Sequence, residues 1–159
     1  MDNNQENAEY LSAHGFSRLK EELLFLKERR RKEIAERLEY AKSLGDLSEN
    51  AEYQEAKEEQ QLVEARIADL EDILSRAVLI SSSVVRDFVD IGSTVVTKRE
   101  GTDKEDAFLI VGREEADPSQ NRISNESPLG RSLIGKKKGE TVLVYTPKGE
   151  IAYQILNIK

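Results

Sequence analysis

The chain of 159 residues contains no cysteine and only one histidine, His14. Without cysteine, neither a disulfide nor a thiolate metal site can form, which is typical of a protein from a reducing compartment. The histidine has no evident acidic partner near the chain start, so we expect an exposed side chain. The sequence also lacks a Ser-His-Asp arrangement, a glycine-rich nucleotide loop and a metal-ligand cluster. We therefore do not expect an enzyme that is complete in itself.

Long apolar runs are absent as well. The longest are far too short to span a bilayer, and the opening residues MDNNQENAEY are polar and acidic where a signal peptide needs positive charge and an apolar stretch. We therefore expect a cytoplasmic protein that makes no membrane contact. The 38% of apolar residues is enough for the folded core of one ordinary domain or of two small ones.

The chain has no excess of positive charge. Its net charge is -7, and residues 1–79 carry all of it, with 12 basic and 19 acidic side chains against 12 and 12 in residues 80–159. An acidic surface repels a phosphate backbone at long range. Autonomous or sequence-specific binding to duplex DNA is therefore not expected, and any contact with nucleic acid must be local.

Helical periodicity dominates the first half of the chain. In its second stretch, apolar residues alternate between spacings of three and four, which is a heptad seam with only Gln60 polar in phase. These apolar residues are Tyr53, Ala56, Val63, Ile67, Leu70, Leu74 and Ala77. Such a seam predicts one helix of a coiled coil.

The first stretch has a similar seam with one irregularity. Leu19, Leu23 and Leu26 begin it, Arg30 interrupts it, and it resumes one residue out of phase at Ile34, Leu38 and Ala41. Ser12 or Ser17 is a suitable N-cap, and Gly45 is a natural C-terminal stop. The few residues between the stretches predict an antiparallel coiled-coil hairpin over residues 1–79, with an exposed tip at 44–49.

Alternation replaces helical periodicity after about residue 80. The segments STVVTK, DAFLIVG, ETVLVYT and EIAYQILNI predict short strands, and TPKGE at 146–150 predicts a tight hairpin turn. Ser127 followed by Pro128 predicts the start of a helix of about two turns that ends at Gly135. The fold class is therefore α+β with two domains: the hairpin, a linker at 80–90, and a small antiparallel β domain with a short helix at 91–159.

The predicted tip gathers acidic side chains. Asp46 and Glu49 are three positions apart, which is the spacing of a capping box at the start of the second helix. Two exposed carboxylates also offer hard oxygen ligands to Mg²⁺, although two alone hold that ion weakly and need completion by other groups. Spacing alone leaves both interpretations open.

Lysines flank this tip on both helices. Lys42 and Lys57 could meet a phosphate backbone beside it, or they could pair with nearby glutamates. The basic run Arg29 to Lys32 is spread around one helical turn, and we expect it to solvate the helix surface.

GDLSENAEYQEAKEEQ at 45–60, together with LSAHGFSRLKEELLFLK at 11–27, resembles the Gre family of bacterial transcript cleavage factors, and specifically its GreA branch. The segment from 110 to 150 is similar to the C-terminal domain of that family along its length, so the resemblance covers nearly the whole chain. Many members have a proline after the arginines of the first helix, where this chain has Lys32.

The resemblance implies a transcription elongation factor whose coiled coil enters the secondary channel of bacterial RNA polymerase. There Asp46 and Glu49 would help to bind a second Mg²⁺ and position a water, so that the polymerase hydrolyses a backtracked nascent RNA near its 3′ end. The isolated protein would hold no metal and have no nuclease activity of its own.

The resemblance also implies roles for residues outside the acidic pair. Lys42 and Lys57 match positions that contact the emerging RNA 3′ end. The C-terminal domain would be FKBP-like and would dock on the rim of the channel, with Ser127, Pro128 and Leu129 in its most recognisable stretch. The GreA type acts mainly on short backtracks.

Two alternatives remain. The first is a regulator of the same fold that occupies the channel and inhibits or modulates the polymerase without cleavage, although GDLSENAEY is the cleavage-competent form of the tip. The second is a coiled-coil adaptor or chaperone-like protein in which the acidic turn only caps a helix.

Overall fold

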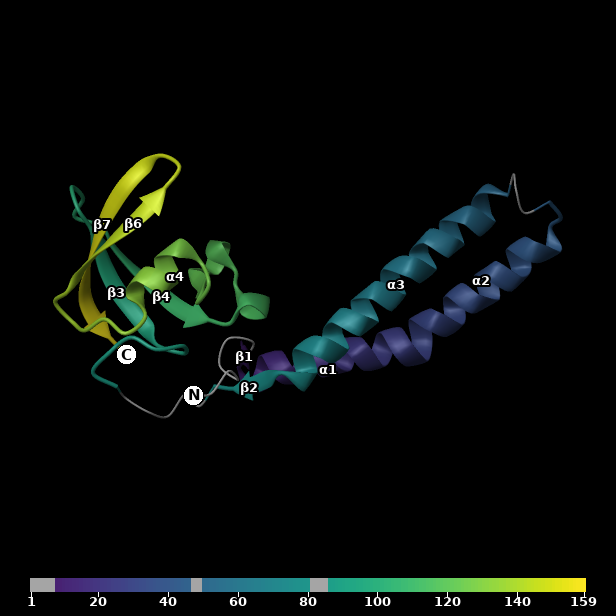
Figure 1. Ribbon diagram of the computed structural model, residues 1–159, viewed down its shortest axis with the longest axis horizontal. Helices are drawn as coiled ribbons and strands as arrows, with labels where there is room; N and C mark the ends of the chain where they lie inside the picture. Colours follow the sequence, from purple (N-terminus) through teal and green to yellow (C-terminus); the bar gives the residue numbers. More distant parts are fainter. Residues whose placement is uncertain (1–7, 47–49, 81–85) are drawn as a thin grey trace, which may run out of the picture. The chain divides into compact units, whose positions relative to one another are not determined.

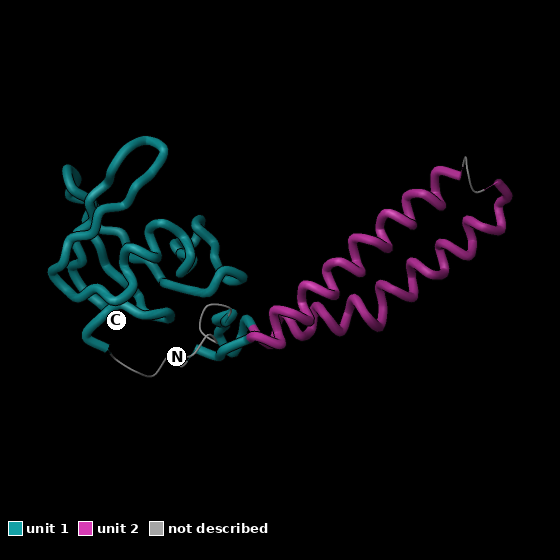
Figure 2. Tube along the Cα trace, in the orientation of Figure 1, with its two compact units in different colours: residues 1–15, 77–159 teal, residues 16–76 magenta. Residues whose placement is uncertain are grey.

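The computed structural model describes residues 8–46, 50–80 and 86–159. The chain forms two compact units, Phe16–Arg76 and a unit made of Met1–Gly15 with Ala77–Lys159 (Figure 2). Contacts therefore group residues 8–15 and 77–79 with the C-terminal part of the chain, whereas the sequence pattern grouped them with the hairpin.

The first of these units is a helical hairpin. It contains α1 (Ala13–Phe25) from Phe16 onward, the π-helical turn η1 (Leu26–Arg30), α2 (Arg31–Ser43) and α3 (Ala51–Ser75), with α2 and α3 side by side (Figure 1). Of the two candidate N-caps, Ser12 precedes α1, and its Oγ accepts from the Gly15 amide at 2.9 Å. Gly45 follows the C-cap Leu44 with φ +119°, which is why a glycine stands there.

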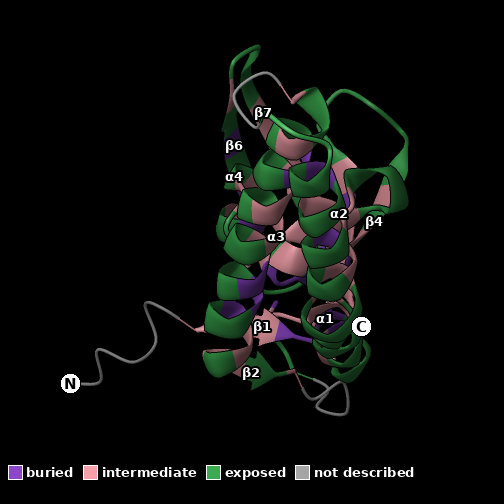
Figure 3. Cartoon of the chain, turned by 90° about the vertical axis from the view of Figure 1, so that its right-hand side faces the viewer, coloured by how far each residue is buried: buried purple, intermediate pink, exposed green. Residues whose placement is uncertain are grey.

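Several apolar positions of α2 and α3 are buried within the hairpin, and buried positions are coloured purple in Figure 3. The fully buried ones are Ile34, Ala41, Ala56, Ile67, Leu70 and Ile73. The predicted seam is confirmed except at its end. There Ile73 is more deeply buried than Leu74, and Ala77 lies beyond the helix as the first residue of a strand.

The π-helical turn explains the phase change in the first seam. The Arg31 amide donates to the carbonyl of Leu26, five residues back, in place of the usual four. Such a turn inserts one extra residue into an α-helix. The insertion lets Leu19 and Ile34 both be buried although the pattern slips by one residue between them.

Ion pairs join the two arms of the hairpin. Glu59 forms ion pairs with Arg30 and with Arg37, the second at 2.6 Å. Arg31 donates two hydrogen bonds to Glu64. Two residues of the basic run thus bridge to α3, and the expectation that the run only solvates the surface is wrong for these two.

The other unit is built on a five-stranded sheet in the order β5-β4-β3-β7-β6. Its strands are β3 (Thr94–Arg99), β4 (Glu105–Val111), β5 (Arg122–Ser124), β6 (Thr141–Thr146) and β7 (Gly149–Ile158). The four predicted strands are confirmed as β3, β4, β6 and β7, and their pairings are antiparallel. The short strand β5 was not predicted, and it pairs parallel to β4.

Apolar side chains from the sheet and its neighbouring segments form a core. It consists of Val89, Val95, Ile110, Leu133, Val142, Val144 and Ile155. Helix α4 (Pro128–Leu133) contributes Leu133 to the core and begins at the N-cap Ser127, as predicted. Gly135 follows the helix with φ +78°. The predicted α+β class is confirmed.

A short parallel pair of strands, β1 (Glu9–Leu11) and β2 (Ala77–Leu79), completes this unit. β1 lies against the 3₁₀ turn η2 (Arg113–Glu115). The approach is close at Gly112, where an added Cβ would lie 1.8 Å from the Tyr10 carbonyl oxygen. Only a glycine fits at that position.

Candidate functional site

The predicted acidic site lies where α2 ends and α3 begins. Asp46 is exposed and directly follows Gly45, and Glu49 lies outside the described residues. Lys42 is exposed in the last turn of α2, and Lys57 is exposed in the second turn of α3. Within the described ranges, neither lysine forms an ion pair, so the predicted pairing with nearby glutamates is not found there.

Asn50 caps α3 and was missed from the sequence. Its side-chain oxygen accepts from the Tyr53 amide at 3.1 Å, and its side-chain nitrogen donates to the carbonyl of Ala41 at 2.7 Å. The capping-box interpretation of Asp46 is therefore wrong, because the helix starts four residues later than that interpretation requires. Three good cap residues, Asp46, Ser48 and Asn50, precede the helix, and propensity alone does not choose among them.

The predicted docking segment forms a tight corner in the other unit. The Ser127 hydroxyl donates to the Ser124 carbonyl at 2.7 Å and accepts from the Gly130 amide at 3.0 Å. Pro128 is exposed at the first position of α4, and Leu129 packs partly against the sheet core. The two hydrogen bonds of Ser127 and the fixed φ angle of Pro128 restrict the backbone of this corner to one conformation.

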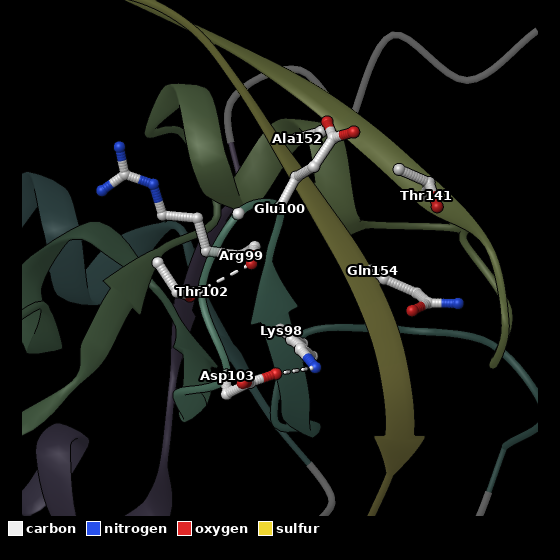
Figure 4. Close-up of a pocket in the computed structure, with 9 residues that line it drawn as sticks. Lys98, Arg99, Glu100, Thr102, Asp103, Thr141, Ala152 and Gln154 are labelled. Carbon is white, nitrogen blue, oxygen red and sulfur yellow. Dashed lines mark hydrogen bonds and ion pairs between the residues drawn. The ribbon is translucent and has the colours of Figure 1, made fainter.

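A surface pocket of about 480 Å³ lies elsewhere, between the turn after β3 and strands β6 and β7 (Figure 4). Lys98 and Asp103 on its wall pair with each other at 2.8 Å. None of the predicted site residues lines it. Across the described residues, no group of three or more His, Cys, Asp or Glu side chains is placed to hold a metal ion.

Comparisons with known proteins decide the family. Residues 9–79 match the model of the family described as Transcription elongation factor, N-terminal, and residues 84–159 match Transcription elongation factor, GreA/GreB, C-term. The chain belongs to the GreA/GreB family of transcription elongation factors.

Curated relatives of this GreA/GreB chain match along nearly all of its length. It is 49% identical over 156 residues to transcription elongation factor GreA of Clostridium acetobutylicum, covering 98% of this chain and 99% of that protein. GreA of Clostridium botulinum is 48% identical over 149 residues, which is 93% of each chain. Among solved structures, GreA factor homolog 1 of Thermus thermophilus is 29% identical, with 96% and 99% of the chains covered and a TM-score of 0.45.

Family membership makes this chain a transcription elongation factor, a class of protein that acts with RNA polymerase. Among the described helices, none combines the length and the apolar character that a bilayer-spanning helix needs.

Proposed function

We propose that this factor stimulates RNA polymerase to hydrolyse backtracked nascent RNA, by inserting the hairpin into the secondary channel of the enzyme. The tip brings Asp46 and Glu49 to the polymerase active site. Hydrolysis there creates a new RNA 3′ end that can be extended, and the arrested complex resumes elongation.

The observation that carries this proposal is the cap of α3. Asn50 supplies the side-chain acceptor at the helix start, so Asp46 is not the N-cap of α3. Asp46 is exposed at the end of two helices that are tied along their length by ion pairs. An acidic group in that position can be presented to another molecule.

The donor chemistry fits Mg²⁺. Carboxylate oxygens are hard ligands, and Mg²⁺ keeps several waters and is usually completed by substrate phosphates or further oxygens. In such a joint site the ion would supply Lewis-acid chemistry, polarising a phosphoryl oxygen and activating a water. The part contributed by this chain is to present Asp46 and Glu49, and two carboxylates are too few to hold the ion without the polymerase.

Lys42 and Lys57 supply positive charge beside the acidic turn. Because neither is engaged by an ion pair within the described residues, both ammonium groups can contact RNA phosphates. We further propose that the corner at Ser127, Pro128 and Leu129 docks on the rim of the channel, since its rigid backbone presents an exposed proline. The protein alone would then have no nuclease activity.

The test adds the purified protein to stalled, backtracked bacterial elongation complexes that carry 3′-labelled RNA. The wild type is expected to release short labelled fragments, whereas Asp46→Ala and Glu49→Ala should release far fewer while still binding the polymerase. Tight binding by a wild type that releases no fragment would instead identify a channel-occupying regulator.

A further inference from the structure

Asn50 joins the C-terminal end of α2 to the N-terminal end of α3. One side-chain amide makes both connections, to the Tyr53 amide in the first turn of α3 and to the Ala41 carbonyl in the last turn of α2. The orientation of the amide follows from its partners, because a backbone N–H can only donate and a carbonyl can only accept.

The Ala41 carbonyl is an important partner in this arrangement. It is one of the last four carbonyls of α2, which lack the regular amide donor four residues further along the helix. It accepts from the Leu44 amide at 3.2 Å and from the Asn50 side chain at 2.7 Å, so both of its lone pairs are used. Ala41 itself is fully buried, so this anchor point lies on the packed face of the hairpin.

We propose that Asn50 is a positioning residue for the acidic pair, beyond its role as a helix cap. Its amide fixes the end of α2 relative to the start of α3, and Asp46 lies in the chain between these two points. Glu49 is the residue directly before Asn50 in the chain. Placement of both carboxylates therefore depends on the bond between the Asn50 amide and Ala41. This inference rests on the proposed function.

The two roles of Asn50 can be separated by substitution. Serine and aspartate are both good N-caps and can still accept from the Tyr53 amide. Neither has the N–H group that bonds the Ala41 carbonyl. Asn50→Ser and Asn50→Asp should therefore retain the cap and lose the connection between the helices, and only the aspartate adds charge beside the turn.

The experiment measures cleavage of backtracked RNA at saturating factor, binding by competition with labelled wild type, and the Mg²⁺ concentration for half-maximal cleavage. Asn50→Ser is expected to bind like wild type but to cleave about tenfold or more slowly, because small errors in the placement of catalytic groups are costly. If the carboxylates are placed less precisely in Asn50→Ser, half-maximal cleavage should also require several-fold more Mg²⁺. A residue with a purely structural role would leave that Mg²⁺ concentration unchanged. Gln54→Ala, which removes an exposed amide one turn further along α3, should match wild type.

The possible results separate the role of Asn50 from the proposed function. Cleavage and Mg²⁺ dependence equal to wild type in Asn50→Ser would show that Asn50 only caps α3 and would overturn the inference. Loss of binding together with cleavage in both the serine and aspartate variants would also overturn it, because the residue would then maintain the hairpin as a whole. If the wild type itself releases no fragment, the proposed function fails and this inference falls with it.

Discussion

Ser12 and Glu115 are 103 positions apart in the chain and share two hydrogen bonds of 2.6 Å, in which the Ser12 amide and hydroxyl both donate to the Glu115 carboxylate. Arg122 donates to the same carboxylate at 3.1 Å. The carboxylate lies at the N-terminus of α1, where the helix dipole favours negative charge. At Gly15 an added Cβ would be 2.5 Å from the Glu115 Cδ. Glu115 thus holds the first turn of α1 against η2.

These contacts predict a pH-dependent contribution to stability. Burial raises the pKa of Glu115, but the hydrogen bonds from Ser12 and the charge of Arg122 together outweigh burial and leave that pKa below its usual value. A carboxyl whose pKa is lower in the folded state stabilises the fold above its unfolded pKa, and this contribution is lost as the pH falls through the folded pKa.

Glu115→Gln is therefore expected to lower the free energy of unfolding by about 2–3 kcal/mol at pH 7. The difference from wild type should shrink progressively as the pH falls below about 4.3, the ordinary glutamate pKa. Urea unfolding at pH 7 and pH 3 measures it. Glu126→Gln, at an exposed position, is the control. A difference that is the same at both pH values would contradict the role of the Glu115 charge.

A second prediction concerns the charges that join the arms of the hairpin. Glu59 forms ion pairs with Arg30 and Arg37, and its side chain is 23% exposed. Glu59→Ala should lower the free energy of unfolding by about 1–2 kcal/mol, since two half-exposed pairs are lost from one network. Glu58→Ala removes an exposed neighbour and should cost less than about 0.5 kcal/mol.

Salt provides the check on this mechanism. Screening weakens exposed ion pairs, and the Debye length is only about 3 Å at 1 M ionic strength. The loss of stability caused by Glu59→Ala, measured by thermal unfolding, should therefore be smaller in 1 M NaCl than in 0.05 M NaCl. The Debye lengths at these concentrations are about 3 Å and over 10 Å. If the loss of stability were the same at both salt concentrations, it would come from lost packing and not from lost ion pairs.

The sequence predicted the long elements and missed the short or long-range features, for physical reasons. The heptad seam and the four longer strands each repeat a period several times. The three-residue strands β1, β2 and β5 are too short to show alternation, and Ala77 continued the helical period by chance. Glu115 could not be linked to Ser12, because no local pattern joins residues so distant in the chain.

At the candidate site, the sequence located the break between the helices, but its capping interpretation offered Asp46 where the structure has Asn50. Asp46 and Asn50 are comparably good caps, and the choice depends on where α3 begins. The deciding contact, from Asn50 to the Ala41 carbonyl, exists only once the two helices are packed. The break in the first seam did reveal a register change, although the pattern could not say that a π-helical turn produces it.

That register change gives a third prediction. Glu28 is exposed within the π-helical turn Leu26–Arg30. Deleting it should convert the turn to regular α-helix and leave both halves of the seam facing α3. Deleting Glu36, which is exposed within α2, should instead rotate the rest of the helix by about 100° and turn Leu38 and Ala41 out of the seam. Circular dichroism should show a melting transition near that of wild type for the first deletion and a large loss for the second.

The fourth prediction concerns the lysines at the tip and rests on the proposed function. Because Lys42 and Lys57 form no ion pair within the described ranges, the double change Lys42→Ala with Lys57→Ala should leave thermal unfolding nearly unchanged. It should slow cleavage of backtracked RNA. The difference in cleavage rate from wild type should become smaller at higher salt, because salt weakens the phosphate contacts of the wild type. Lys20→Ala, an exposed lysine in α1, is the matched control. If the double variant cleaves at the wild-type rate at low salt, the RNA contact is absent and these lysines only solvate the hairpin.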